Sequence, residues 1–164
     1  MKFKIVSLSL FLAFTFSLAQ AQSQESKIQA IFLLKFVENV SWPKEKTGLV
    51  IGVVGSSEVL AEIEGRLKLK NPDGFVVKKV TASEAGTCDV VFLPSSKDNH
   101  FAAVTESLQN KSILLITESD LAKKGACISF QKESGKLQFL INKNEVEARG
   151  LKIGSSLLSL GTQV

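Results

Sequence analysis

The sequence predicts a single α/β domain, a three-layer sandwich whose mostly parallel central sheet carries a C-terminal antiparallel hairpin. Two observations predict this fold class. Continuous apolar runs of strand length, such as Leu49–Val54 and Cys88–Pro94, are typical of strands buried on both faces of a parallel sheet. Segments with helical periodicity alternate with these runs and are joined to them by short polar links, which favours strand–helix–strand units.

The first 21 residues have the three parts of an export signal. Lys2 and Lys4 give a basic start, Ile5–Leu18 is apolar, and Ala19-Gln20-Ala21 is a small-residue cleavage pattern. The apolar run is shorter than the roughly 20 residues of a membrane span, and polar residues follow it. We therefore expect a signal peptide at 1–21 and an exported domain at 22–164, with no membrane insertion after cleavage.

The first half of the mature chain begins with an amphipathic helix. Apolar residues between Lys27 and Val40 recur at close to helical spacing, and their stripe is wider than one contact face requires. Trp42-Pro43 ends this helix, because the residue before a proline is disfavoured in helical geometry. We then expect a strand, a helix and a second strand at 49–54, 58–67 and 75–80, with a turn at 71–74.

The strand at 88–94 is expected near the centre of the sheet, because polar, turn-rich segments flank it. A helix at 101–108, a strand at 112–117 and a helical turn at 118–124 follow, and Gly125 can close that turn. Two runs flanking Glu133–Lys136 predict the hairpin. Asn142 can cap a helix from Lys143 to Arg149, and the apolar tail at 151–160 either docks or stays available.

Charge and cysteine content restrict the classes of function. Lys2 and Lys4 supply part of the net charge of +4, and the other lysines are interspersed with acids, so nucleic-acid binding has no electrostatic support. Cys88 and Cys127 are an even pair in an exported chain, which favours a disulfide, with two buried free thiols as the alternative. Their separation excludes a CxxC site, and with His100 as the single histidine we expect neither a metal nor a cofactor.

Local motifs for chemistry are weak. Gly52–Ser57 could offer backbone amides to an anion, but a tight strand-to-helix turn explains it better. Ser95 and Ser96 follow the central strand, where α/β folds often place ligands, yet no GxSxG elbow surrounds them. The carboxylate of Asp89 opposes thiolate formation at Cys88. We expect no catalytic residues.

Three motifs, in order along the chain, carry a resemblance to a known family. They are IQAIFLLKFVENVSWP at 28–43, CDVVFL at 88–93 and the closing run from Leu137 to Leu160, with GACISF at 125–130 between the last two. Together they resemble the YfiR-like family of periplasmic proteins over almost the whole mature chain. The resemblance implies a periplasmic, non-enzymatic regulator that represses a membrane diguanylate cyclase by binding its periplasmic part, which lowers cyclic-di-GMP. It also implies a disulfide between Cys88 and Cys127.

A regulator of this kind needs an apolar surface that its partner can bury. The first helix and the tail are the candidates, and we expect partner contacts from Phe32, Phe36, Trp42, Leu157 and Leu158. The same helix is also a candidate homodimer interface. A sensor kinase is the alternative membrane partner. The alternative function is a small-ligand sensor that uses the loops after Val54 and Leu93 and acts through a kinase or a transporter.

Overall fold

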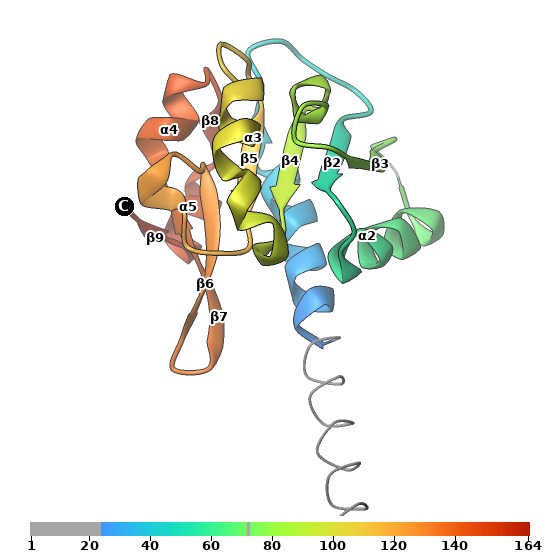
Figure 1. Cartoon of the computed structure of the whole chain (residues 1–164), viewed down its shortest axis with the longest axis horizontal. Helices are drawn as coiled ribbons and strands as arrows, with labels where there is room; N and C mark the ends of the chain where they lie inside the picture. Colours follow the sequence, from blue (N-terminus) through green and yellow to red (C-terminus); the bar gives the residue numbers. More distant parts are fainter. Residues whose placement is uncertain (1–23, 72) are drawn as a thin grey trace, which may run out of the picture.

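A seven-stranded sheet forms the centre of the structure, and a second sheet has two strands (Figure 1). The computed structural model of the chain describes residues 24–71 and 73–164, so the predicted signal peptide at 1–21 lies outside the described residues. The strands are β1 Val40–Ser41, β2 Val50–Val54, β3 Val76–Val80, β4 Val90–Leu93, β5 Leu114–Thr117, β6 Ile128–Glu133, β7 Lys136–Ile141, β8 Lys152–Ile153 and β9 Thr162–Gln163.

The order of the large sheet is β3-β2-β4-β5-β6-β7-β9. Neighbouring strands from β3 to β6 are parallel, β6 and β7 form an antiparallel hairpin, and β9 pairs in parallel with the end of β7. Ser134 and Gly135 both have positive φ at the tip of the hairpin, as a tight two-residue turn requires. The predicted mostly parallel sheet with a C-terminal hairpin is confirmed.

Helices cover both faces of this sheet. In Figure 1 the helix α3 lies in front of the strands, and the first helix, drawn in blue, lies behind them. The helices are the first helix at 24–38, α2 Glu58–Leu69, α3 Phe101–Ser107, α4 Lys143–Ala148 and α5 Ser155–Leu160, with short 3₁₀ turns η1 Ala85–Thr87, η2 Ser95–His100 and η3 Ala122–Lys124. In the part of the chain described, no helix has the length and apolar character needed to cross a membrane.

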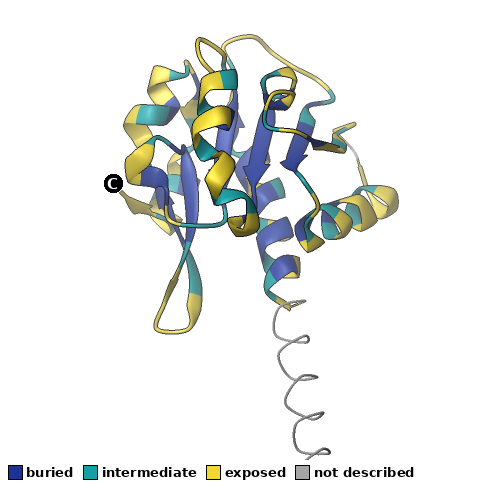
Figure 2. Ribbon diagram, in the orientation of Figure 1, coloured by how far each residue is buried: buried dark blue, intermediate teal, exposed yellow. Residues whose placement is uncertain are grey.

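The central strands are buried on both faces, as their unbroken apolar sequence predicts (Figure 2). Behind them, Phe36 of the first helix is fully buried and packs on the hairpin strands. Its ring centroid lies 4.8 Å from that of Phe139 on β7 and 5.6 Å from that of Phe130 on β6. These rings fix the first helix on the hairpin end of the sheet.

The predicted disulfide between Cys88 and Cys127 is wrong for this structure, because both cysteines are free and buried. Cys88 comes just before β4 and Cys127 just before β6, and β5 runs between these two strands. Strands two positions apart are separated by about 10 Å, whereas a disulfide needs Cα atoms within roughly 7 Å. Cys88 instead fills space over β2, where a Cβ on Gly52 would lie 2.5 Å from its Sγ.

The tail forms structure that the sequence did not predict in detail. The sequence predicts only an apolar stretch at 151–160. In the structure this stretch contains β8 and α5, and β8 pairs with β1, which directly follows the first helix. The chain then returns to the large sheet as β9. Gly161 makes this return feasible, because a Cβ there would lie 2.4 Å from the Phe139 ring. The tail is therefore docked.

Substitution of Phe36 tests how much the aromatic contact stabilises the domain. We expect Phe36→Ala to lower the free energy of unfolding by about 3–5 kcal/mol, since it leaves a cavity beneath the first helix. Ile31→Ala on the same helix is the control, because Ile31 is exposed and should cost less than about 1 kcal/mol. Urea denaturation of both variants measures the difference. Equal small losses would show that Phe36 does not anchor the helix.

The free thiols predict that the fold does not depend on oxidation. Protein of residues 22–164 purified without reductant should show two reactive thiols after denaturation, one from each buried cysteine. Dithiothreitol should leave its urea midpoint unchanged, because no cross-link constrains the unfolded chain. Thiol titration with Ellman's reagent measures the first quantity. Absence of reactive thiols together with a lower midpoint in reductant would contradict the structure.

Candidate functional site

The five residues expected to contact a partner lie in different environments. Phe36 and Leu157 are buried, so the prediction that they form a partner surface is wrong, and both fill the hydrophobic core instead. Phe32, Trp42 and Leu158 are partly buried and pack against that core. The helical repeat identified the apolar stripe correctly, but it could not separate the centre of the stripe, which faces the sheet, from its margin.

Trp42 lies apart from the others, beyond the C-terminal end of the first helix. It lines a cavity of about 890 Å³ together with Lys46, Leu49 and Phe75. Its indole Nε1 is buried and has no hydrogen-bond partner among the described residues. The neighbouring Asp89 has a structural role, because it accepts a hydrogen bond from the backbone N–H of Val50 and pairs with Lys46.

The chain just after the first helix contacts the start of α5. The backbone N–H of Gly154, just before α5, donates to the carbonyl oxygen of Asn39 at 2.8 Å, and the Ser156 hydroxyl donates to Asn39 Oδ1 at 2.9 Å. At the other end of α5, Gly161 rests on the ring of Phe139, whose centroid lies 5.6 Å from that of Phe32. The tail is therefore attached to the end of the first helix at Asn39 and approaches Phe32 through Phe139.

Apolar side chains of the first helix and of the tail are exposed. Leu160 is 73% exposed, Ile31 42% and Val164 38%. Sequence reasoning did not predict that these three side chains are exposed, because the sequence alone does not distinguish an exposed apolar residue from a buried neighbour in the same stripe. We call the set the helix–tail surface, and it consists of Ile31, Phe32, Leu158, Leu160 and Val164.

A separate cleft of about 940 Å³ opens at the carboxyl ends of the parallel strands. Ser56 and Ser57 line it from the loop after β2, Ser95 and Ser96 from the loop after β4, and Glu118 from the end of β5. The chain reverses its winding direction between β2 and β4, the point where open α/β sheets usually bind ligands. The structure thus brings together the two loops that the sequence singled out after Val54 and Leu93.

Glu118 connects the elements around this cleft. Its Oε2 accepts hydrogen bonds from the Ser95 backbone N–H at 2.7 Å and from the Ser95 hydroxyl at 2.9 Å. Its Oε1 accepts from Gln29 Nε2 of the first helix at 3.2 Å. Gln29 is 1% exposed, and its own Oε1 has no partner among the described residues. One polar acceptor is therefore buried beside the cleft without a hydrogen bond.

The residues weighed for catalysis are engaged in other contacts or are unreactive. The Ser95 hydroxyl donates a hydrogen bond to Glu118. Among the described residues, no hydrogen bond links His100 to Ser95 or Ser96. Burial raises the pKa of the Cys88 thiol, and it raises the pKa of Cys127 to about 11, so both thiols are protonated at neutral pH. In the described residues no group of histidine, cysteine and carboxylate side chains could hold a metal ion.

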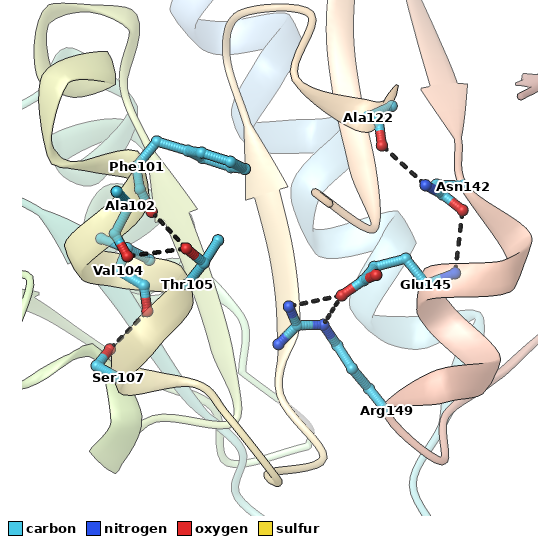
Figure 3. A network of polar contacts seen from close by, with 9 residues as sticks. All are labelled: Phe101, Ala102, Val104, Thr105, Ser107, Ala122, Asn142, Glu145 and Arg149. Atoms are coloured by element: carbon cyan, nitrogen blue, oxygen red, sulfur yellow. Dashed lines mark hydrogen bonds and ion pairs between the residues drawn. The ribbon is translucent and has the colours of Figure 1, made fainter. Parts of the chain in front are cut away.

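The acids of α4 also have structural partners (Figure 3). Glu145 Oε1 accepts from Arg149 Nε at 2.9 Å, and the Asn142 side chain caps the helix by accepting from the Glu145 backbone N–H at 3.0 Å. Glu147 pairs instead with Lys143 at 3.6 Å. The two glutamates do not act together, as their spacing on a helix predicts.

The fold was compared with solved structures, and the sequence with curated proteins. Among solved structures, the ABC domain from Streptococcus pneumonia in complex with L-Trp is similar, with a TM-score of 0.59 and 16% identity. The match covers 85% of this chain and 61% of that chain, so this chain spans less than two thirds of its length, and at this identity the likeness concerns the fold alone. A search of curated proteins finds no match.

The match to a protein-family model is more specific. The model described as YfiR/HmsC-like matches residues 26–162, which include most of the first helix, strands β2 to β7 of the large sheet and most of the tail. It therefore spans both the cleft and most of the helix–tail surface. The chain belongs to the YfiR/HmsC-like family, whose members are periplasmic regulators of diguanylate cyclase signalling.

Proposed function

We propose that this protein is a non-enzymatic regulator that binds the periplasmic part of a membrane diguanylate cyclase through the helix–tail surface and holds the cyclase inactive. The observation that carries the proposal is the exposure of Leu160 and Ile31 beside a docked tail. Large apolar side chains exposed on a folded domain often mark protein interaction sites, and the proposed interface would bury both. Family membership supports the class of partner.

The helix–tail surface could form only the apolar centre of an interface. Burying one large aliphatic side chain contributes about 1.5–3 kcal/mol, so this surface can supply the apolar centre of an interface. Specific interfaces bury about 800 Å² on each partner, so a polar rim must complete it. Lys35, which pairs with Glu38 at 2.6 Å on the exposed side of the first helix, is placed for such a rim.

Other partners could bind the same surface, and the cytoplasmic output distinguishes a cyclase from them. A sensor kinase with a similar periplasmic part would bury the same residues and give a different cytoplasmic output. A second copy of this chain would also bury them, and this homodimer would compete with the membrane partner. Repression of the cyclase predicts that its activity rises when this protein is removed.

The strand-end cleft supports a second candidate function, sensing of a small ligand. Its volume of about 940 Å³ lies in the range of small-molecule sites, and the unpartnered Gln29 Oε1 lies beside it. The structurally similar ABC domain was solved with L-Trp, so amino acids are the first ligands to test. A ligand at this position would lie against Glu118, whose hydrogen bond from Gln29 links the cleft to the first helix.

Charge substitution of Leu160 tests the regulator proposal. We expect Leu160→Asp to keep its fold, because the side chain is 73% exposed, and to lose capture of the cyclase from solubilised membranes. In the native host, deletion of the gene should raise cyclic-di-GMP, and Leu160→Asp should fail to lower it again. Leu69→Asp is the matched control, since Leu69 is 89% exposed on α2, and it should behave like the wild type. Equal capture by both variants would exclude the helix–tail surface.

Thermal unfolding tests the sensor candidate. An amino acid that binds the cleft should raise the melting temperature with concentration, since a ligand at 100 times its dissociation constant adds about 2.7 kcal/mol. L-tryptophan is the first probe. Glu118→Ala should abolish the shift, because it removes the acceptor that holds Ser95 and Gln29. A shift that persists in Glu118→Ala, or no shift with any amino acid, would contradict ligand binding at this cleft.

A further inference from the structure

The two edges of the large sheet differ in length. β9 at one edge has two residues, whereas β3 at the other edge has five and pairs along its whole length with β2 (Figure 1). An edge strand presents backbone groups that a strand from another chain can bind, and many proteins shorten their edge strands for this reason. β9 is short, but β3 is a full strand and three of its five residues are exposed.

The backbone hydrogen bonds of β3 show which of its residues face β2. The Val76 N–H donates to the Leu49 carbonyl oxygen at 3.0 Å, and the Gly55 N–H donates to the Val80 carbonyl oxygen at 2.9 Å. In a parallel ladder, every second residue of a strand bonds to a given neighbour. Residues 76, 78 and 80 therefore use their backbone groups in the pairing with β2.

The other two residues of the strand face away from the sheet. The N–H and C=O groups of Val77 and Lys79 point outward, and among the described residues nothing binds them. Each outward residue can exchange two hydrogen bonds with a residue of an antiparallel strand placed beside it. The β3 edge is therefore ready to accept one more strand.

The side chains of the edge determine which strand fits it. Val76 is 52% exposed, and Lys78 and Lys79 are exposed on opposite faces of the sheet. Lys79 makes no side-chain hydrogen bond or ion pair with a described residue, and Lys78 donates only to the Thr87 hydroxyl at 3.4 Å. The edge thus has an apolar beginning, followed by two cations.

One acid lies near these lysines, on the face of Lys78. Glu84 Oε2 accepts hydrogen bonds from the Thr81 backbone N–H at 2.9 Å and from the Thr81 hydroxyl at 2.8 Å. These bonds lower the pKa of Glu84, and the Lys78 ammonium makes a smaller contribution in the same direction. Glu84 therefore balances part of the Lys78 charge, whereas Lys79 on the other face keeps its charge unpaired.

A second copy of this chain does not suit the edge. The two-fold register that uses both outward residues pairs Val77 of one copy with Lys79 of the other, and it places the two Lys78 side chains directly opposite each other. Like charges directly opposite in a strand pair are destabilising, and an edge lysine is a common protection against self-pairing. The same lysines attract a strand that carries carboxylates.

We propose that the β3 edge binds an extended acidic segment of another protein as an added antiparallel strand. Read from its N-terminus, the segment places two acids opposite Lys79 and Lys78 and then two apolar residues opposite Val77 and Val76. The inference does not rest on the helix–tail surface. Its failure would leave the proposed regulatory function unchanged, because capture of the cyclase is measured with the Leu160 variant.

The test uses protein of residues 22–164 labelled with ¹⁵N and a capped peptide, TEEVVT, with TKKVVT as the charge-reversed reference. We expect saturable chemical-shift changes along β3 with TEEVVT and at least about tenfold weaker binding of TKKVVT. At saturation, hydrogen exchange should slow at the amides of Val77 and Lys79. Exchange at Lys78 should change little, since its N–H is already bonded within the sheet.

Variants at one residue separate the backbone from the charge. Lys79→Pro removes an outward N–H without breaking the pairing with β2, so binding should be lost while the urea midpoint stays close to that of the wild type. Lys79→Gln keeps the N–H and should weaken binding about threefold. Lys123→Gln in η3 is the matched control and should bind like the wild type.

Four results would overturn the proposal. They are no saturable change with TEEVVT, equal binding of TKKVVT, shifts without slower exchange at Val77 and Lys79, and shifts along β3 when the protein alone is concentrated. The third result would indicate contact with the lysines only, and the fourth would identify a second copy as the occupant. If Lys79→Pro does not fold, the exchange pattern of the wild type and the Lys79→Gln affinity decide.

Discussion

The burial of β4 and β5 on both faces is the constraint on which the rest of this structure depends. Strands without a solvated face must be covered on both sides, so helices have to lie in front of and behind the sheet. The first helix meets this need at the hairpin end through Phe36, Phe130 and Phe139. Because strands β3 to β6 are parallel, the same constraint gathers the loops after β2, β4 and β5 at one edge, where the strand-end cleft lies.

The fold was predictable because its signals are local. Apolar runs, the hairpin turn and the caps at Asn142 and Gly125 each act within a few residues, and the structure has all of them. The pairing of β1 with β8 and the return of β9 were not predictable, since strands of two residues carry no periodicity. The expected disulfide failed for the related reason that cysteine count and compartment do not specify strand order, and β5 separates the two thiols.

The candidate sites show the same limit. Sequence patterns identified the apolar stripe of the first helix and the apolar tail, but burial depends on which side of each element meets the sheet. Phe36 and Leu157 are therefore core residues, whereas Leu160, three residues after Leu157 in α5, is largely exposed.

The central claim is that the helix–tail surface is the part of the protein that its membrane partner covers. Hydrogen–deuterium exchange of the protein, alone and bound to the solubilised cyclase, tests this claim most directly. The account predicts slower exchange in the first helix around Ile31 and in residues 155–164, with little change in η2. Protection confined to the loops around Ser95 and Lys97, with an unchanged tail, would contradict it and would identify the strand ends as the interface.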